Sequence, residues 1–437
     1  MDRRAAVEKR IASRFIPAIV LSSGIALAIP AAHADVVFAV DTILDQVDAD
    51  TGDGQCRTSA NRCSLRAAVM QANHVGDPGL TIIQLPAGIY ALTLAPSGMN
   101  GEDEGDLNLV TPATGDQTLS IIGAGAASTI IDGNHLDRVL AIDVGCTARI
   151  SGVTIRNGTR TGNSFGGGIA NRGSLAIADS VIEENRADQG GGIDNSGVLD
   201  MLRCTVRSNT AQYGGGMYVY GDTLLRDSTL EGNSASPGSG GAIFNANQLR
   251  VVNSTLSRNA ADTDGGAIYN NYKAYVYSSS IVNNDADHDR DENGGSGGGV
   301  HAAAFTGAQF LIINVLFAYN TVLDAPIYND CAGTLDAVGW NLFGEPSGCS
   351  INGPWGLVTP ATIGPLQNHG GPTRTHALLA GSEAVDPPSG SSSCVDDEGE
   401  DMPTDQRGAA RVSGAGCDIG AFESGSVVDL VFTDGFD

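Results

Sequence analysis

Basic residues are scarce in this chain of 437 residues. It holds 24 Lys and Arg against 50 Asp and Glu, a formal net charge of −26. Such a charge repels phosphate backbones and anionic membrane surfaces, so no nucleic acid partner is expected. Acidic polysaccharides would be repelled too, unless a cation bridged them. The acidity is most simply explained as a means of keeping an exported protein soluble.

Long apolar runs are almost absent as well. The longest covers residues 16–29 and follows a basic region (Arg3, Arg4, Lys9, Arg10, Arg14), and Ala32-His33-Ala34 has the small-x-small form of a cleavage site. The run is shorter than the ~20 residues that a membrane span needs, which favours a signal peptide over residues 1–34. Its removal takes away five basic and two acidic residues, so the net charge becomes −29. We expect a mature chain without a transmembrane segment, secreted or associated with the outer surface of a bacterium.

Helical periodicity is missing from most of the chain, and a repeat takes its place. A Gly-Gly-x-Ile motif recurs six times, with third residues at 168, 192, 216, 242, 267 and 299. The steps are 24, 24, 26, 25 and 32 residues. A second motif, which ends in Asn, keeps the same period through Asn185, Asn209, Asn233, Asn259 and Asn284. A fixed period of this length is typical of a solenoid.

Each repeat contains short β-branched runs that alternate apolar and polar residues, separated by Gly, Asn, Asp and Ser. No repeat has room for an amphipathic helix, and the leucine-rich frame is missing. The sequence therefore predicts an all-β fold, a single-stranded right-handed parallel β-helix with coils stacked about 4.8 Å apart. Stacked asparagines would form an amide ladder, and the glycines would turn corners at positive φ.

Eight cysteines in an exported chain favour disulfides. Six lie outside the regular repeats in three local pairs: Cys56 with Cys63, Cys331 with Cys349, and Cys394 with Cys417. Cys146 and Cys204 are separated by more than two repeats, which would place them about 10 Å apart, beyond the ~7 Å limit for a bridge. We expect these two to stay reduced and buried.

The repeat divides the chain into five parts. Residues 1–34 are the signal, 35–80 an N-terminal cap module, 81–330 the β-helix and 426–437 a tail. Residues 331–425 form a C-terminal module that begins with a last coil or cap, at Trp340 to Gly344, and continues as an irregular segment. Within the cap module, residues 63–73 have helical spacing, with Ser64 as N-cap and one apolar face. An open β-helix end exposes core and strand edges, so we expect this helix to cover it.

Two clusters suggest binding. Alternate carboxylates at Asp285, Asp287, Asp289 and Asp291 suit calcium, although Glu292 stands where an EF-hand has Gly, and a solvated acidic loop is the alternative. Seven tyrosines within three repeats would suit glycan binding by ring contact if they shared one face; simple packing on strands is the alternative. They are Tyr213, Tyr218, Tyr220, Tyr269, Tyr272, Tyr275 and Tyr277.

Three stretches carry a family resemblance. Cys63-Ser-Leu-Arg-Ala-Ala-Val69 resembles the Cys-Ser-Leu-Arg-Glu-Ala motif of bacterial exported β-helix proteins, with Ala67 in place of the Glu. The repeats resemble those of chlamydial polymorphic outer membrane proteins and of pectate-lyase-like β-helices. Residues 370–378, 405–408 and 417–421 resemble the C-terminal choice-of-anchor module of such proteins. The resemblance implies a surface-associated β-helix and brings no particular reaction with it.

No catalytic residue is predicted. The acidic candidates are Asp188, Asp194, Asp200, Asp262 and Asp264. Three of them, Asp188, Asp262 and Asp264, lie in turns before glycine corners, where turn chemistry commonly explains Asp. The motif series of pectin hydrolases and pectate lyases are missing. The leading hypothesis is a non-enzymatic protein that binds a polysaccharide or another cell-surface component. A polysaccharide lyase or glycoside hydrolase and a purely structural rod are the alternatives.

Overall fold

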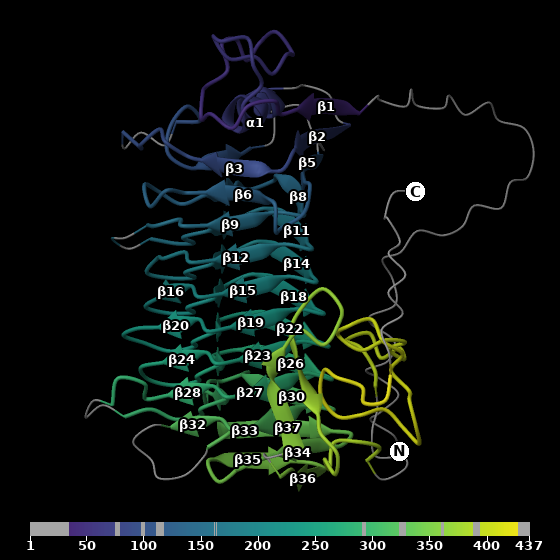
Figure 1. The fold of residues 1–437 in the computed structure, drawn as a ribbon. Coiled ribbons are helices and arrows are strands. Elements are labelled where there is room, and N and C mark those ends of the chain that lie inside the picture. Colours follow the sequence, from purple (N-terminus) through teal and green to yellow (C-terminus); the bar gives the residue numbers. More distant parts are fainter. Residues whose placement is uncertain are drawn as a thin grey trace, which may run out of the picture. The chain divides into compact units, whose positions relative to one another are not determined.

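The protein is a right-handed parallel β-helix closed at one end by a helix (Figure 1). The structure, a computed structural model, describes residues 35–74, 79–97, 101–110, 118–160, 162, 164–290, 294–322, 329–359, 362–387 and 394–426. The predicted signal peptide, Asp291 and all but the first residue of the predicted tail lie outside these ranges. Among the described residues, no helix has the length and apolar character needed to cross a membrane.

Stacked parallel strands form columns along the β-helix, and the sheet of 20 strands contains two of them. The first column consists of β4 (Leu107–Leu109), β7 (Leu140–Ile142), β10 (Ile169–Asn171), β13 (Ile193–Asn195), β17 (Met217–Val219), β21 (Ile243–Asn245), β25 (Ile268–Asn270) and β29 (Val300–Ala302). The second consists of β1 (Val36–Ala39), β2 (Leu80–Leu85), β5 (Thr118–Gly123), β8 (Thr147–Ser151), β11 (Ser174–Ala178), β14 (Val198–Leu202), β18 (Asp222–Arg226), β22 (Gln248–Val252), β26 (Lys273–Tyr277), β30 (Gln309–Ile313) and β35 (Cys349–Asn352). Strand β33 (Cys331–Val338) pairs with β29 and with β30, and so joins both columns.

Two further sheets complete each coil. The sheet of 11 strands consists of β3 (Gly88–Ala91), β6 (Thr129–Asp132), β9 (Thr154–Arg156), β12 (Val181–Glu183), β15 (Thr205–Arg207), β19 (Thr229–Glu231), β23 (Thr255–Ser257), β27 (Ser280–Val282), β31 (Leu316–Ala318), β34 (Asn341–Phe343) and β36 (Trp355–Leu357). The sheet of five short strands consists of β16 (Thr210–Ala211), β20 (Ser234–Ala235), β24 (Ala260–Ala261), β28 (Asp285–Ala286) and β32 (Thr321–Val322). Strands β33 to β36 extend the solenoid past residue 330, so the loss of the repeat in the sequence does not mark the last coil.

The glycine motif forms the sharp corner before each strand of the first column. Gly190 has φ +61°, a region that costs a side chain about 1–2 kcal/mol. A Cβ on the next residue, Gly191, would lie 2.5 Å from the carbonyl oxygen of Gly215 in the neighbouring coil. The motif is thus required by backbone conformation at its first position and by the close approach of coils at its second.

Buried asparagines form the predicted amide ladder. The Nδ2 of each donates to the Oδ1 of the next, at 2.9–3.0 Å from Asn185 through Asn209, Asn233, Asn259 and Asn284 to Asn320. The ladder ends on the carboxylate of Asp330, which accepts from Asn320 at 2.7 Å. Burial raises the pKa of Asp330 to about 6. Each ladder Nδ2 also donates to a backbone carbonyl of the preceding coil, for example Asn233 to Val206 at 3.0 Å.

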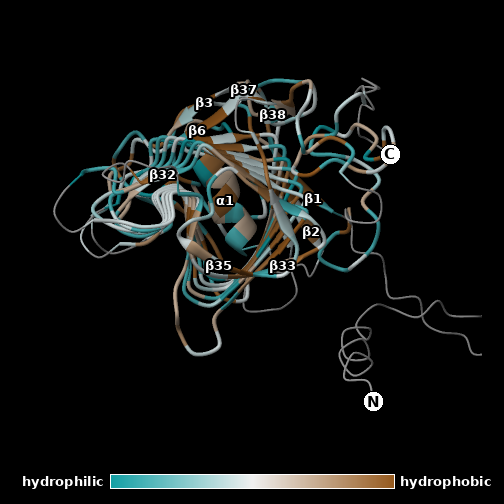
Figure 2. Ribbon diagram, turned by 90° about the horizontal axis from the view of Figure 1, so that it is seen from below, coloured by the Kyte–Doolittle hydropathy of each residue, from teal (hydrophilic) through white to brown (hydrophobic). Residues whose placement is uncertain are grey.

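Helix α1 (Leu65–His74) covers the N-terminal end of the solenoid, as predicted (Figure 2). Ser64 Oγ accepts from the amide of Ala67 at 3.1 Å, which makes Ser64 the N-cap. Leu65, Ala68, Val69 and Ala72 join the continuous hydrophobic core of the coils. On the other side of α1, the buried Arg66 forms an ion pair with Asp45 at 2.7 Å.

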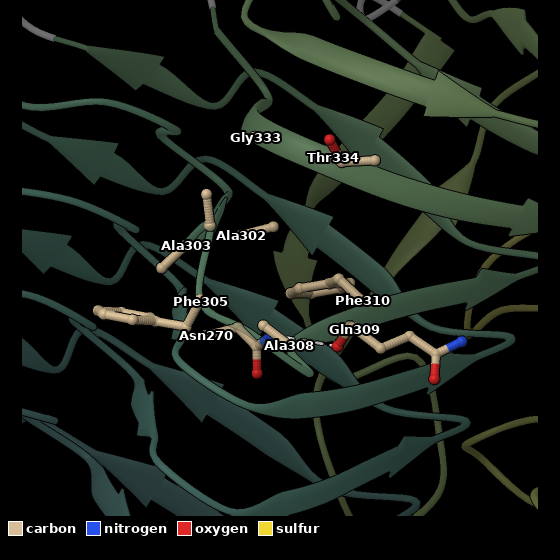
Figure 3. A pocket seen from close by; sticks show the side chains of 10 residues that line it. Asn270, Ala302, Ala303, Phe305, Ala308, Gln309, Phe310, Gly333 and Thr334 are labelled. Carbon is tan, nitrogen blue, oxygen red and sulfur yellow. Dashed lines mark hydrogen bonds between the residues drawn. The ribbon is translucent and has the colours of Figure 1, made fainter.

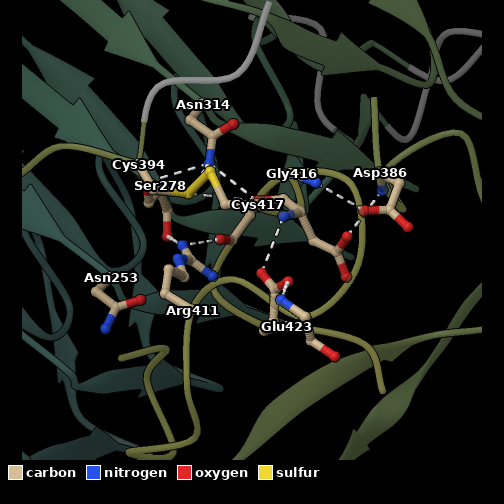
Figure 4. The surroundings of a disulfide bond; sticks show 12 residues. Asn253, Ser278, Asn314, Asp386, Cys394, Arg411, Gly416, Cys417 and Glu423 are labelled. Atoms are coloured by element: carbon tan, nitrogen blue, oxygen red, sulfur yellow. Dashed lines mark hydrogen bonds between the residues drawn. A yellow bond between two sulfur atoms is a disulfide. The ribbon is translucent and has the colours of Figure 1, made fainter. Parts of the chain in front are cut away.

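The three predicted disulfides are formed, and Cys146 and Cys204 are free and buried. The Cys394–Cys417 bond lies in the C-terminal module, which packs along the flank of the coils together with the hairpin of β37 (Ile363–Gln367) and β38 (Thr375–Leu378) (Figure 4). Gln406 anchors this module: its Nε2 donates to Thr229 Oγ1 at 2.9 Å, and its Oε1 accepts from Thr255 at 2.6 Å. Arg411, fully buried, donates to the carbonyl of Ser278.

Candidate functional site: a groove at the glycine corners

One column of outward-facing residues runs along the first strand column. In every strand there, the residues before and after the central position point inward, so the central side chain points to the exterior. The strand register stacks these central residues coil upon coil. From the N-terminal side they are Ala170, Asp194, Tyr218, Phe244, Tyr269 and His301.

A second column faces the first across the glycine corner. It consists of the residue that precedes the first corner glycine in each coil: Phe165, Gln189, Tyr213, Ser239, Asp264 and Ser296. Backbone pairings stack these residues in the same order. The corner turns the chain, so the side chains of the two columns meet, as the ring contact of Tyr213 with Phe244 shows. We give the name corner groove to the strip of surface that the two columns form together; its first column spans five coil steps, about 24 Å at the strand spacing.

Aromatic rings fill the middle of the corner groove. The ring of Phe244 stacks between Tyr218 and Tyr269, with centroids 5.0 and 4.9 Å apart and interplanar angles of 6° and 28°. Tyr269 in turn stacks on His301 at 5.0 Å. Because the rings stack face to face along the axis, they present edges and phenol groups to the groove rather than broad faces.

The phenols of Tyr218 and Tyr269 are available for a ligand. Neither hydroxyl has a hydrogen-bond partner within the described ranges of the chain. Both side chains are half-buried, and burial raises the pKa of each phenol above its ordinary value. The hydroxyls therefore stay protonated at neutral pH, as donors two coil steps or about 10 Å apart.

Asp194 lies toward the N-terminal end of the groove. Its side chain is only 7% exposed, and no described residue forms a hydrogen bond with its carboxylate. Burial raises the pKa of Asp194 to about 7, although Arg138 and Arg172 nearby oppose the shift. Arg138 is itself held by Asp106 at 2.7 Å and donates to the carbonyl of Phe165. Because the carboxylate oxygens of Asp194 still reach the surface, they can accept hydrogen bonds from a ligand at this end of the groove.

A polar cluster lies at the other end. Ser296 Oγ is 2.6 Å from Asp264 Oδ1 and 2.8 Å from His301 Nδ1. Burial would raise the pKa of Asp264, but hydrogen bonds from His301 and Ser296 outweigh it and keep this pKa below its ordinary value. With Nδ1 engaged in this way, the Nε2 of a neutral His301 is left as an acceptor.

The seven tyrosines of the sequence hypothesis do not share one face. Tyr213, Tyr218 and Tyr269 line the corner groove. Tyr220, in the turn between β17 and β18, is 62% exposed. Tyr272, in the turn between β25 and β26, lies beside Lys273. Tyr275 and Tyr277 pack against the C-terminal module near Met402.

The predicted calcium cluster is spread over β28 and the turn that follows it. Asp285 accepts a hydrogen bond from Thr321, Asp287 is buried, and Asp289 is exposed. Among the described residues, no group of three or more His, Cys, Asp or Glu is arranged to hold a metal ion. Calcium at this turn stays a hypothesis, since Asp291 lies outside those residues.

The other acidic candidates do not join Asp194. Asp188 accepts from the amide of Ser164 at 3.0 Å, Asp200 is exposed on β14, and Asp262 is buried in the turn after β24. Asp264 lies three coil steps from Asp194, about 14 Å along the axis. Paired carboxylates of glycosidases are about 5–9.5 Å apart, so these two are too distant to act on one bond.

Sequence reasoning missed Phe165, Phe244 and His301 as groove residues. The signal was present, because each holds a fixed position relative to its glycine corner. The binding hypothesis grouped residues by type, as tyrosines, whereas position in the repeat is what these three residues share with Tyr213, Tyr218 and Tyr269.

A family model, the Chlamydia polymorphic membrane protein repeat, matches residues 253–271. This segment covers β23, β24 and β25 and includes one glycine corner of the groove. No match was found among curated proteins or among solved structures. The three disulfides are typical of proteins outside the reducing cytoplasm. The chain is therefore a right-handed parallel β-helix with a repeat similar to those of polymorphic membrane proteins, which are bacterial surface proteins.

Proposed function

We propose that the protein is an exported surface protein that binds a neutral glycan along the corner groove without cleaving it. The observation that carries the proposal is one column that presents the Asp194 carboxylate and the phenols of Tyr218 and Tyr269 to the surface, none of them hydrogen-bonded to a described residue. A row of neutral donors with a carboxylate acceptor suits a chain of sugar hydroxyls, each of which both donates and accepts.

Charge selects the type of glycan. The chain carries a net charge of −26, so a polyanion would approach against repulsion. Phe165, 45% exposed at the end next to Asp194, adds an apolar surface against which a sugar ring can pack.

The enzyme alternative rests on the raised pKa of Asp194 and on the Asp264–Ser296–His301 cluster, since a carboxyl of pKa about 7 is suited to proton transfer. The separation of the two acidic groups argues against a two-carboxylate mechanism.

The test is incubation of the purified protein with neutral and acidic polysaccharides, counting both retained protein and new chain ends. We expect retention on a neutral polymer without new ends. Asp194→Ala places in this coil the residue that Ala170 holds in the preceding one. It should weaken retention about ten- to hundredfold, because a hydrogen bond to a charged group contributes about 1.5–3 kcal/mol.

Tyr220→Phe, which changes an exposed phenol outside the groove, is the matched control and should bind as wild type. New ends that Asp194→Ala abolishes would establish the enzyme instead. Retention unaffected by Asp194→Ala would place the binding site elsewhere.

A further inference from the structure

In one coil near the C-terminal end, the connection between the first-column strand and the second-column strand is longer than in the two coils before it. Two residues join β21 to β22 and β25 to β26, whereas six residues, Ala303 to Ala308, join β29 to β30. This connection borders a cavity of about 150 Å³ (Figure 3). Its apolar lining includes Ala302, Ala308 and Phe310, and its polar lining includes Gln309 and Thr334.

The cavity exists because a second asparagine ladder stops at this place. Asn245 and Asn270 hold equivalent positions in successive coils, and Asn245 Nδ2 donates to Asn270 Oδ1 at 2.6 Å. In the next two coils the same position is held by Ala302 and then Gly333. The missing carboxamides leave a volume above Phe310, whose ring is 1% exposed.

The polar atoms at the cavity have unequal roles. Asn270 uses its amide on the carbonyls of Tyr272 and Gln309, at 3.2 and 3.1 Å, so it has no donor left. Gln309 receives a long contact of 3.5 Å from Tyr275, and Thr334 is exposed. Gln309 and Phe310 are consecutive in β30, so their side chains point to opposite faces, and the Gln309 amide extends away from the alanines of the cavity (Figure 3). The Thr334 hydroxyl remains to pair with a polar ligand group.

The cavity adjoins the corner groove. Ala303 continues the alternation of β29, so it faces outward like His301, two residues or about 7 Å away. A glycan that ends beside His301 would bring a ring substituent to this opening.

We propose that the cavity takes the acetamido group of an N-acetylated sugar unit bound at the His301 end of the corner groove. This inference rests on the proposed function. The methyl group would lie against Ala302, Ala308 and Phe310, while the amide pairs with Thr334. A cavity of about 150 Å³ accommodates a group as large as benzene, and a sugar hydroxyl alone would leave most of it empty.

The experiment compares two neutral tetramers with the same β-1,4 linkage, one of N-acetylglucosamine and one of glucose, by titration calorimetry. They differ in the acetamido group at each unit. We expect the acetylated tetramer to bind at least tenfold more tightly, the scale on which a small apolar group is distinguished by a pocket.

Ala308→Leu fills the cavity and should remove the preference, leaving both tetramers at the affinity of the glucose tetramer. Ala246→Leu, at the corresponding connection between β21 and β22, is the control and should keep the preference. Thermal unfolding of both variants checks that they fold. If Ala308→Leu does not fold, Thr334→Val is used in its place, because it removes the hydroxyl that pairs with the acetamido group.

The outcomes separate the two proposals. Equal binding of both tetramers, or a preference that Ala308→Leu and Thr334→Val both leave intact, would overturn the acetamido site and spare the groove. Binding of neither tetramer or of any other neutral polysaccharide would overturn the proposed function and this inference with it.

Discussion

The inside and the outside of the same corner follow different rules. Inside, the ladder repeats one residue from Asn185 to Asn320 and changes only at its end, Asp330. Outside, the first column of the corner groove has the same period but reads Ala, Asp, Tyr, Phe, Tyr and His.

The difference has a physical cause. A buried amide must donate and accept in a fixed geometry, and only its like in the next coil satisfies both requirements. An outward position must merely fit its neighbours, so its identity is free to serve a ligand. In a solenoid of this kind, variation within a periodic column is the sign of a functional surface.

Breaking the interior column should have the largest effect. Asn233 bonds to Val206, to Asn259 and, through its Oδ1, to Asn209, so Asn233→Ala leaves several buried groups without partners. We expect a loss of about 3–5 kcal/mol in the free energy of unfolding, measured in urea. Asn352→Ala, an exposed asparagine with one surface bond to Asp336, should change it by less than about 0.5 kcal/mol. A similar small loss for Asn233→Ala would contradict the ladder.

Asp194, in the outer column, should make the free energy of unfolding depend on pH. Its pKa of about 7 lies above the ordinary 3.8, so the folded state binds the proton more tightly, and this stabilising contribution is lost as pH rises from about 4 to about 7. Asp194→Asn should therefore gain stability relative to wild type by roughly 2 kcal/mol between pH 5 and pH 8. Asp227, Asp330 and Glu423 also have raised pKa values, so the difference between variant and wild type is the quantity to measure. A difference that stays constant with pH would contradict the burial of a titrating carboxyl.

Removing phenols from the outer column should separate binding from stability. Tyr218→Phe and Tyr269→Phe keep the ring stack and lose one hydroxyl each. Each should weaken glycan retention about three- to tenfold, the net value of one hydrogen bond, and change the free energy of unfolding by less than about 0.5 kcal/mol. Unchanged retention in both variants would leave the phenols without a role.

The smallest expected effect on the free energy of unfolding is that of substituting Cys204. It occupies the position of Ser180 and Ser228 in neighbouring coils, where the serine hydroxyl accepts from a backbone amide of the preceding coil. Cys204→Ser restores this pattern, and we expect a change in the free energy of unfolding within about 1 kcal/mol. Burial raises the pKa of the Cys204 thiol to about 12, so the wild-type thiol should resist alkylation until the protein unfolds. Rapid alkylation of the native protein would contradict its burial.

Much of the scaffold could be predicted because the repeat encodes it locally. The period predicted one coil per repeat, and the corner glycines predicted where the chain turns. The spacing of Cys56 and Cys63 was short enough to indicate their disulfide. After residue 330 the period is lost but coils continue, because β33 and β34, the latter within the predicted last coil or cap at Trp340 to Gly344, pair with the preceding coil from sequence that does not match the motif. A coil requires inward apolar residues and compatible turns, and several sequences satisfy this.

The sequence by itself determined the parallel β-helix, its register, the helix that caps it, the amide ladder and the buried thiols, because each follows from stacking like upon like at a fixed period. Only the tertiary structure decided which aromatic rings meet, that Asp194 has no hydrogen-bond partner among the residues the structure describes, and that the C-terminal module covers Tyr277 and anchors Gln406 beside Thr229. These contacts join residues on opposite sides of a corner or more than 100 positions apart. They depend on the shapes of folded surfaces, which no periodic pattern records.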